Sequence, residues 1–131
     1  MLSATIGGRA RAVLIHETAP RVVSPTTIGD EVLEHLPAIA RKRHLDLGIL
    51  LPVLVALPID WVEAGDYAND EDEARTRMRG RDEDDWPIVA LALHLLWKQT
   101  KGAIWTQDRD LEMSRIPTLT TGEILDYLER R

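Results

Sequence analysis

Apolar and polar residues follow one another along the chain in blocks that predict short strands alternating with helices. Stretches of helical length separate four β-prone runs, which are Arg21–Val23, Ile59–Val62, Ala103–Thr106 and Thr118–Leu119. This alternation is typical of a mainly parallel sheet, because parallel strands need long crossover connections. We therefore expect a single α/β domain over residues 1–131, a three-layer α/β/α sandwich with a mainly parallel central sheet.

Five further segments of the chain predict helices of different character. A helix that carries Glu31 should end or kink at Pro37 and be followed by a second helix from 38 to 43. The apolar stretch 45–57 predicts a buried helix, whereas the mostly polar stretch 66–79 predicts an exposed one. The final helix should start with a capping box between Thr120 and Glu123.

The helix that follows the acidic run Asp82–Asp85 is apolar on almost every side. Asp84 or Asp85 can serve as its N-cap, and Pro87 falls in its first turn, where a missing N–H is harmless. Because apolar residues continue from 88 to 96, we expect this helix to be largely buried.

Carboxylates also follow the strand predicted at residues 103–106, where the chain continues to Asp108 and Asp110. Acids therefore stand at the start of a helix and at the end of the next strand. In an α/β sheet these two places lie along the carboxyl edge of the strands, where ligand sites usually form. A divalent cation is the commonest reason to gather like charges at such an edge, although Asp84, Asp85 and Asp110 could equally cap helices.

The amino-acid composition excludes several kinds of metal site and membrane segment. The chain has no cysteine, which excludes disulfides and thiolate metal sites, and its longest apolar run is too short to span a bilayer. We expect a cytoplasmic protein without a membrane segment. With 16 basic and 22 acidic residues the net charge is −6, which argues against binding nucleic acid by bulk electrostatics. An acidic protein can still act on nucleic acid when bound cations invert the local potential.

Three segments of the sequence resemble the second half of a PIN domain, the nuclease fold of VapC-type toxins and PilT N-terminus-like ribonucleases. They are an Asp heading an Ala- and Leu-rich helix over 85–93, a strand ending in Thr-x-Asp-x-Asp-Leu over 105–111, and a last strand and helix over 116–125. In addition, Glu31-Val32 follows Ser24-Pro25 at the position of the family's second acid. By spacing alone, Glu31 could instead be a solvated residue on a helix surface.

The resemblance implies a metal-dependent endoribonuclease. Glu31, Asp85 and Asp108 would be the catalytic carboxylates, and together with Asp110 they would hold Mg²⁺ or Mn²⁺. Asp84 is the alternative to Asp85 as ligand, and Thr106 could hydrogen-bond a carboxylate or a metal-bound water. RNA and, in a toxin–antitoxin pair, a small antitoxin protein would be the partners.

The family's first strand and its terminal Asp have no counterpart in the sequence and would lie just upstream of Met1. We therefore expect an N-terminally truncated PIN-like domain with little or no nuclease activity. The alternative is a catalytically impaired module kept for binding or assembly, or a chain whose start lies too far downstream. Strand edges left unpaired by the missing strand would favour a homo-oligomer.

Overall fold

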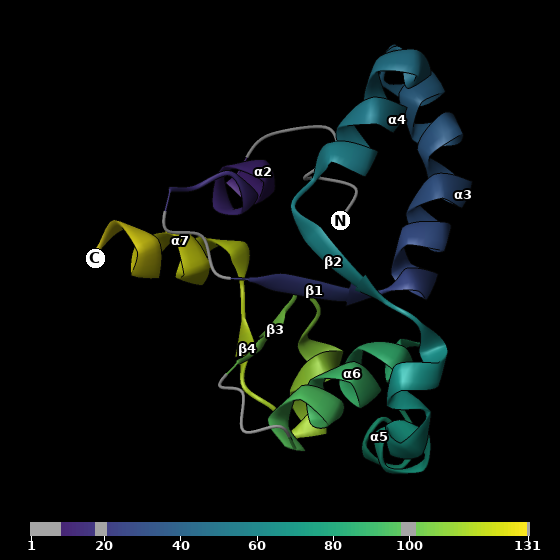
Figure 1. Cartoon of the computed structure of the whole chain (residues 1–131), viewed down its shortest axis with the longest axis vertical. Coiled ribbons are helices and arrows are strands. Elements are labelled where there is room, and N and C mark those ends of the chain that lie inside the picture. The colour runs from purple at the N-terminus through teal and green to yellow at the C-terminus, as the bar shows by residue number, and fades with distance from the viewer. Residues whose placement is uncertain (1–8, 18–20, 98–101, 131) are drawn as a thin grey trace.

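The computed structural model describes residues 9–17, 21–97 and 102–130, and its strands are all parallel (Figure 1). β1 (Val22–Pro25) pairs with β2 (Ile59–Val62), and β3 (Ile104–Trp105) pairs with β4 (Thr118–Leu119). These strands alternate with helices, which confirms the predicted α/β class. β2 and β4 have the predicted bounds, whereas β1 continues two residues beyond Val23.

The four strands form two separate parallel pairs, where the sequence predicted one central sheet. Within the described ranges, no strand hydrogen-bonds to both β1 and β3. β3 and β4 have only two residues each, so their ladder is short. The hydrophobic helices, more than the strand ladders, therefore hold the two pairs in place.

α3 (Thr26–Lys42) and α4 (Leu47–Ala56) form an antiparallel hairpin that extends away from β1 and β2 (Figure 1). α3 runs through Pro37, so the predicted separate helix at 38–43 is wrong. Leu36 and Ala40, on either side of Pro37, are both buried in the same core cluster. Burial of this apolar face outweighs the hydrogen bond that proline removes.

The prediction that the stretch 45–57 is a buried helix is also wrong in part. α4 buries Leu50 and Leu54 against α3, but the Ile49 and Val55 side chains are 64% and 82% exposed. Among the described residues, α4 packs on α3 through the one face that carries Leu50 and Leu54.

The polar stretch after β2 is less exposed than its composition predicted. It forms the 3₁₀ helix η1 (Ala64–Asp70) and α5 (Glu71–Arg77). Tyr67, Ala74 and Met78 in this stretch are fully buried in one cluster with residues of α6 (Trp86–Trp97). These three residues are seven and four positions apart, so they form one helical stripe, and the prediction of an exposed helix is wrong for that face.

α6 is largely buried, as its apolar sequence predicted. Val89 and Ala90 have no exposed surface, and Leu91 and Leu93 have almost none. Within the described ranges, neither α6 nor any other helix combines the length and apolar character that crossing a membrane would require.

α2 (Arg9–Leu14) and α7 (Thr121–Glu129) lie side by side and share a small core of Val13, Ile124 and Leu128 (Figure 1). The predicted capping box at the start of α7 is confirmed. The Glu123 N–H donates to the Thr120 hydroxyl at 3.2 Å, and the Thr120 N–H donates to the Glu123 carboxylate at 3.0 Å. The Trp105 indole N–H donates to the Thr121 hydroxyl at 2.9 Å, which ties α7 to β3.

Candidate metal centre

Three carboxylates from two separate segments of the chain meet in front of α6. Asp82, Asp85 and Asp108 each offer one oxygen atom, and these atoms all lie within 4.8 Å of one another. Asp85 is half-buried, and Asp82 and Asp108 are exposed. We refer to these three residues as the acidic triad.

Local geometry explains how Asp82 and Asp85 come together. Residues Glu83–Asp85 form a 3₁₀ turn, η2, in which the Asp85 N–H donates to the Asp82 carbonyl at 3.2 Å. A 3₁₀ turn places side chains three positions apart almost directly over one another. The acidic run therefore folds so that Asp82 and Asp85 point to the same side, while α6, which begins at Trp86, anchors the turn in the core.

A hydrogen-bonded turn positions Asp108 just after β3. The Thr106 N–H donates to the Leu119 carbonyl at 3.0 Å, which extends the β3–β4 ladder by one residue. The Thr106 hydroxyl accepts the Asp108 N–H at 2.9 Å, and the Asp108 carboxylate accepts the Asp110 N–H at 2.9 Å. Asp108 thus caps the 3₁₀ helix η3 (Arg109–Ser114) with one carboxylate oxygen.

The acidic triad is electrostatically unfavourable without a cation. The pKa of Asp85 is raised from 3.8 to about 6, first by burial and then by the charges of Asp82 and Asp108. A side-chain hydrogen bond with Asp82 and the more distant charge of Glu31 act in the same direction. Near neutral pH these acids therefore favour either a bound proton or a bound cation.

The other acids that the sequence predicts as site residues or as their alternatives lie outside the acidic triad. Glu31 is exposed on α3 and lies outside the acidic triad, although its charge acts on Asp85. Asp110 is half-buried and forms an ion pair with Arg81 at 3.3 Å. Asp84 is exposed and lies outside the triad.

Sequence reasoning did not identify Asp82 as a candidate ligand. It stands at the start of the acidic run, three positions before Asp85. A helix starting at Asp84 or Asp85 would have left it in the preceding loop. Asp82 and Asp85 are three positions apart, and a 3₁₀ turn brings side chains at that spacing to the same side. Interpreting the acidic run as a 3₁₀ turn would have identified Asp82.

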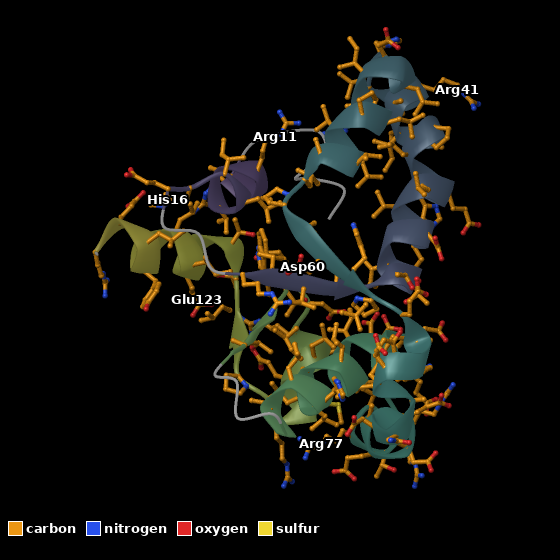
Figure 2. All side chains as sticks on the ribbon, in the orientation of Figure 1. Arg11, His16, Arg41, Asp60, Arg77 and Glu123 are labelled. Atoms are coloured by element: carbon orange, nitrogen blue, oxygen red, sulfur yellow. The ribbon has the colours of Figure 1, made fainter. Side chains whose placement is uncertain are left out.

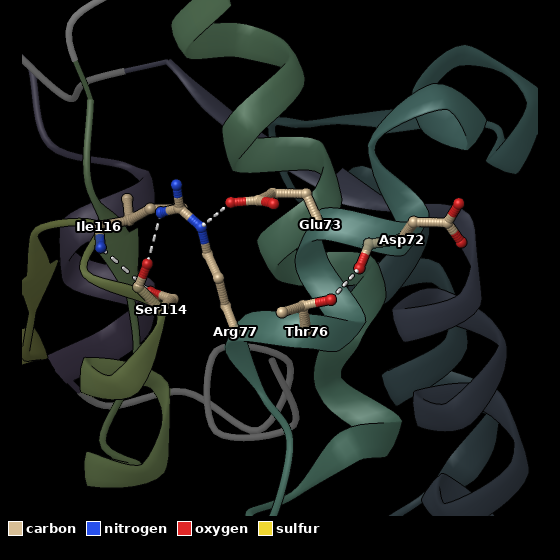
Figure 3. A network of polar contacts seen from close by, with 6 residues as sticks. All are labelled: Asp72, Glu73, Thr76, Arg77, Ser114 and Ile116. Atoms are coloured by element: carbon tan, nitrogen blue, oxygen red, sulfur yellow. Dashed lines mark hydrogen bonds and ion pairs between the residues drawn. The ribbon is translucent and has the colours of Figure 1, made fainter.

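α5 braces the segment that follows Asp108 (Figure 3). The Arg77 guanidinium donates to the Glu73 carboxylate at 3.0 Å and to the Ser114 carbonyl at 2.6 Å. The buried Ser114 hydroxyl donates to the Leu111 carbonyl at 2.7 Å and accepts the Ile116 N–H at 3.2 Å. These contacts fix the C-terminal end of η3, the helix that Asp108 begins.

Trp86, next to Asp85, is held in a similar way from α5 and η1. The Arg75 guanidinium lies 4.6 Å from the Trp86 ring centroid, and the Tyr67 ring meets Trp86 edge-on at 6.1 Å. The Tyr67 hydroxyl is buried and makes no hydrogen bond of normal geometry with the described residues. Aromatic packing, more than polar contacts, therefore fixes the residue that follows the triad's buried member.

A hollow of about 320 Å³ lies between α5 and η3, lined by Glu73, Thr76, Arg77, Met113 and Arg115. No residue of the acidic triad lines it. Two of the triad's three members are exposed to solvent.

The sequence model of the PIN domain family matches residues 1–129. No curated protein and no solved structure matches the chain. Since the family match covers nearly the whole sequence, the chain belongs to the PIN domain family.

Proposed function

We propose that this PIN domain is a metal-dependent endoribonuclease whose cation is held by the acidic triad. The observation that carries the proposal is the convergence of Asp82, Asp85 and Asp108 within 4.8 Å, with the pKa of Asp85 raised to about 6. Membership of the PIN domain family supports hydrolysis of phosphodiester bonds as the chemistry, and the resemblance to PIN-domain ribonucleases supports RNA as the substrate.

The donor set suits Mg²⁺ or Mn²⁺. All three side chains offer hard oxygen atoms, and no cysteine is available to attract softer metals. A divalent cation at such a site lowers the pKa of bound water and offsets negative charge on a phosphate. The half-buried Asp85 would be the anchoring ligand, because the proton it retains near pH 6 is the one a cation would displace.

The remaining acids take supporting roles in this proposal. Glu31 contributes negative charge from α3 and can orient a metal-bound water from outside the triad. Asp110 is paired with Arg81, so we place it in the outer shell, where its N–H orients the Asp108 carboxylate. Thr106 orients the Asp108 backbone through its hydroxyl.

The natural partners would be RNA and, by the resemblance to toxins, a small antitoxin protein. The triad is open to solvent on two of its three members, as access for a chain-like substrate requires. An inhibitor that covers this surface would block the same access.

The proposal is tested by Mn²⁺-dependent cleavage of a structured RNA, compared with DNA of the same sequence. Asp85→Asn and Asp108→Asn should each lower cleavage by about 100-fold or more, because a water displaced by about 1 Å can already cost that factor. Asp84→Asn is the matched control, since it removes the same charge from an exposed neighbour outside the triad.

Calorimetry with Mn²⁺ separates the two function hypotheses. Binding that depends on Asp85, without cleavage of RNA, would assign the chain to the catalytically impaired alternative. If Asp85→Asn and Asp108→Asn both keep Mn²⁺ binding and RNA cleavage, the proposed site is wrong.

A further inference from the structure

The end of α5 and the segment that follows it run alongside η3 in the opposite direction. Arg77 on α5 donates to the Ser114 carbonyl at the end of η3 at 2.6 Å, as Figure 3 shows. Four positions later, Arg81 forms its 3.3 Å ion pair with Asp110 near the start of η3. We call the surface between these two segments, residues 73–82 and 108–115, the α5–η3 seam.

The two ends of the α5–η3 seam carry different groups. Asp82 and Asp108 of the acidic triad stand at one end. The hollow of about 320 Å³ lies at the other end, where Met113 and Arg115 line it. η3 has six residues, so its two ends are about 12 Å apart. Stacked nucleotides of one strand advance by about 3.4 Å each, so about two to four nucleotides would span this distance.

The walls of the hollow suit a nucleobase. The Arg77 guanidinium forms one wall, and its bonds to the Glu73 carboxylate at 3.0 Å and to the Ser114 carbonyl fix its plane. Because Glu73 offsets its charge, Arg77 offers a fixed flat group on which a base can stack. The Met113 side chain is 39% exposed and supplies an adaptable apolar surface.

Arg115 brings an uncompensated positive charge to the same hollow. Its side chain is exposed and enters no ion pair with any residue that the structure describes. Its backbone is left-handed, with φ at 63°, a conformation that is unfavourable for a residue with a side chain. In a chain of net charge −6, this guanidinium at the rim of a polar hollow is suited to bind a phosphate.

We propose that the hollow is a nucleotide subsite for single-stranded RNA, an inference that rests on the proposed function. With the scissile phosphate at the acidic triad, the strand would follow the α5–η3 seam past Arg81. A base about two to four nucleotides away would stack on Arg77, and Arg115 would contact a phosphate beside it. The RNA must be unpaired there, because a base within a duplex is stacked and paired and cannot enter a hollow of this size.

RNA binding without cleavage tests the charge in the subsite. Fluorescence anisotropy with a single-stranded RNA of about 12 nucleotides, in EDTA and at low salt, measures the affinity alone. Arg115→Ala should weaken binding by about 5- to 20-fold and lower the salt slope by about 0.7, the value for one phosphate contact on a single strand. Arg115→Lys should keep the slope. Arg41→Ala is the matched control, because Arg41 is exposed and Figure 2 places it at the opposite end of the molecule from Arg77.

A second pair of variants tests the space in the hollow. Thr76 is exposed on α5 and lines the hollow, so Thr76→Trp should fill it and weaken RNA binding by about 10-fold. Thr76→Val leaves the hollow open and should bind as the wild type does. In Mn²⁺, Arg115→Ala and Thr76→Trp should raise KM for RNA cleavage with kcat unchanged, because the subsite lies away from the reacting phosphate. Circular dichroism of all variants should match the wild type.

The outcomes separate this subsite from the proposed function. Wild-type affinity and KM in both Arg115→Ala and Thr76→Trp would overturn the subsite, even where the acidic triad cleaves RNA. RNA binding that depends on Arg115 and on an open hollow, without cleavage in Mn²⁺, would support the subsite and overturn the proposed function. An equal dependence on Arg115 and Thr76 for binding duplex RNA would overturn the requirement for an unpaired base.

Discussion

α6 and α4 have nearly the same apolar character and opposite surroundings. α6 is covered by η1, α5, β1 and β3, and its Val89 and Ala90 have no exposed surface. α4 is packed against α3 on one face, and Val55 on another face is 82% exposed. The sequence of each helix reports how apolar it is, but not how many of its faces the rest of the chain will cover.

The comparison also explains where charge can be concentrated. Asp82 and Asp85 stand just before α6, on a segment that is packed against the core, and Asp108 lies beside them in the turn after β3. Like charges can be kept together there because packing opposes their repulsion. On the hairpin, the acidic residues Asp30, Glu31 and Glu34 lie in the first half of α3, apart from the basic residues at its end.

The largest expected effect is on stability, and it compares a residue that is packed against α6 with a residue on the exposed face of α4. Met78→Ala should lower the free energy of unfolding by about 2–5 kcal/mol, because Met78 is fully buried against α6. Val55→Ala on α4 should change it by less than about 0.5 kcal/mol in the monomer. Urea unfolding at a concentration where the chain is monomeric measures both. Equal losses in the two variants would contradict the contrast between α6 and α4.

A second prediction concerns which acids hold the cation. Asp82→Asn should weaken Mn²⁺ binding by more than the roughly 10- to 100-fold that outer-shell partners contribute, whereas Glu31→Gln should stay within that range. Calorimetric titration with Mn²⁺ distinguishes them. If Glu31→Gln has the larger effect, the cation lies closer to α3 than the triad geometry indicates.

A third prediction follows from the pKa of Asp85, which is raised from 3.8 to about 6 in the folded chain. The folded state binds the proton more tightly than the unfolded state does. Protonated Asp85 therefore costs no stability below pH 4, and the free energy of unfolding falls as pH rises from 4 to 6. Above pH 6 the loss is complete. Asp85→Asn should remove this pH dependence and stabilise the metal-free domain at pH 7.5 by about 1 kcal/mol after allowance for solvent screening.

Thermal unfolding at pH 4 and pH 7.5, with and without Mn²⁺, measures this effect. The advantage of Asp85→Asn should vanish when Mn²⁺ stabilises the wild type. An advantage of the same size at both pH values would show that charge at Asp85 is not its cause.

The smallest expected effect lies in the capping box of α7. Thr120→Ala should lower the free energy of unfolding by about 1 kcal/mol, because it removes the acceptor for the Glu123 N–H. Thr120→Ser keeps that acceptor and should recover most of the loss. Urea unfolding checks both variants, and cleavage activity should remain unchanged because α7 lies outside the acidic triad.

Local sequence was sufficient for the features that depend on neighbouring residues alone. The α/β alternation, the strands at 59–62 and 118–119, the burial of α6 and the capping box all followed from periodicity and from short-range hydrogen bonding. The family was also identifiable from three motifs, and the family match confirms it. Asp85 and Asp108 are identifiable as candidate acids because the sequence pattern alone places them before a helix and after a strand.

Only the tertiary structure decided the features that depend on long-range packing. It determined that Pro37 lies within α3, since Leu36 and Ala40 reach a common core formed by distant segments. It also determined what α5 contacts. This polar helix packs against α6 and hydrogen-bonds to η3 through Arg77 and the Ser114 carbonyl. It also chose Asp82 as the third member of the acidic triad, because the 3₁₀ turn and the loop after β3 meet in space. A sequence supplies candidate residues, whereas the packing of segments far apart in the chain selects the side chains that come within reach of one cation.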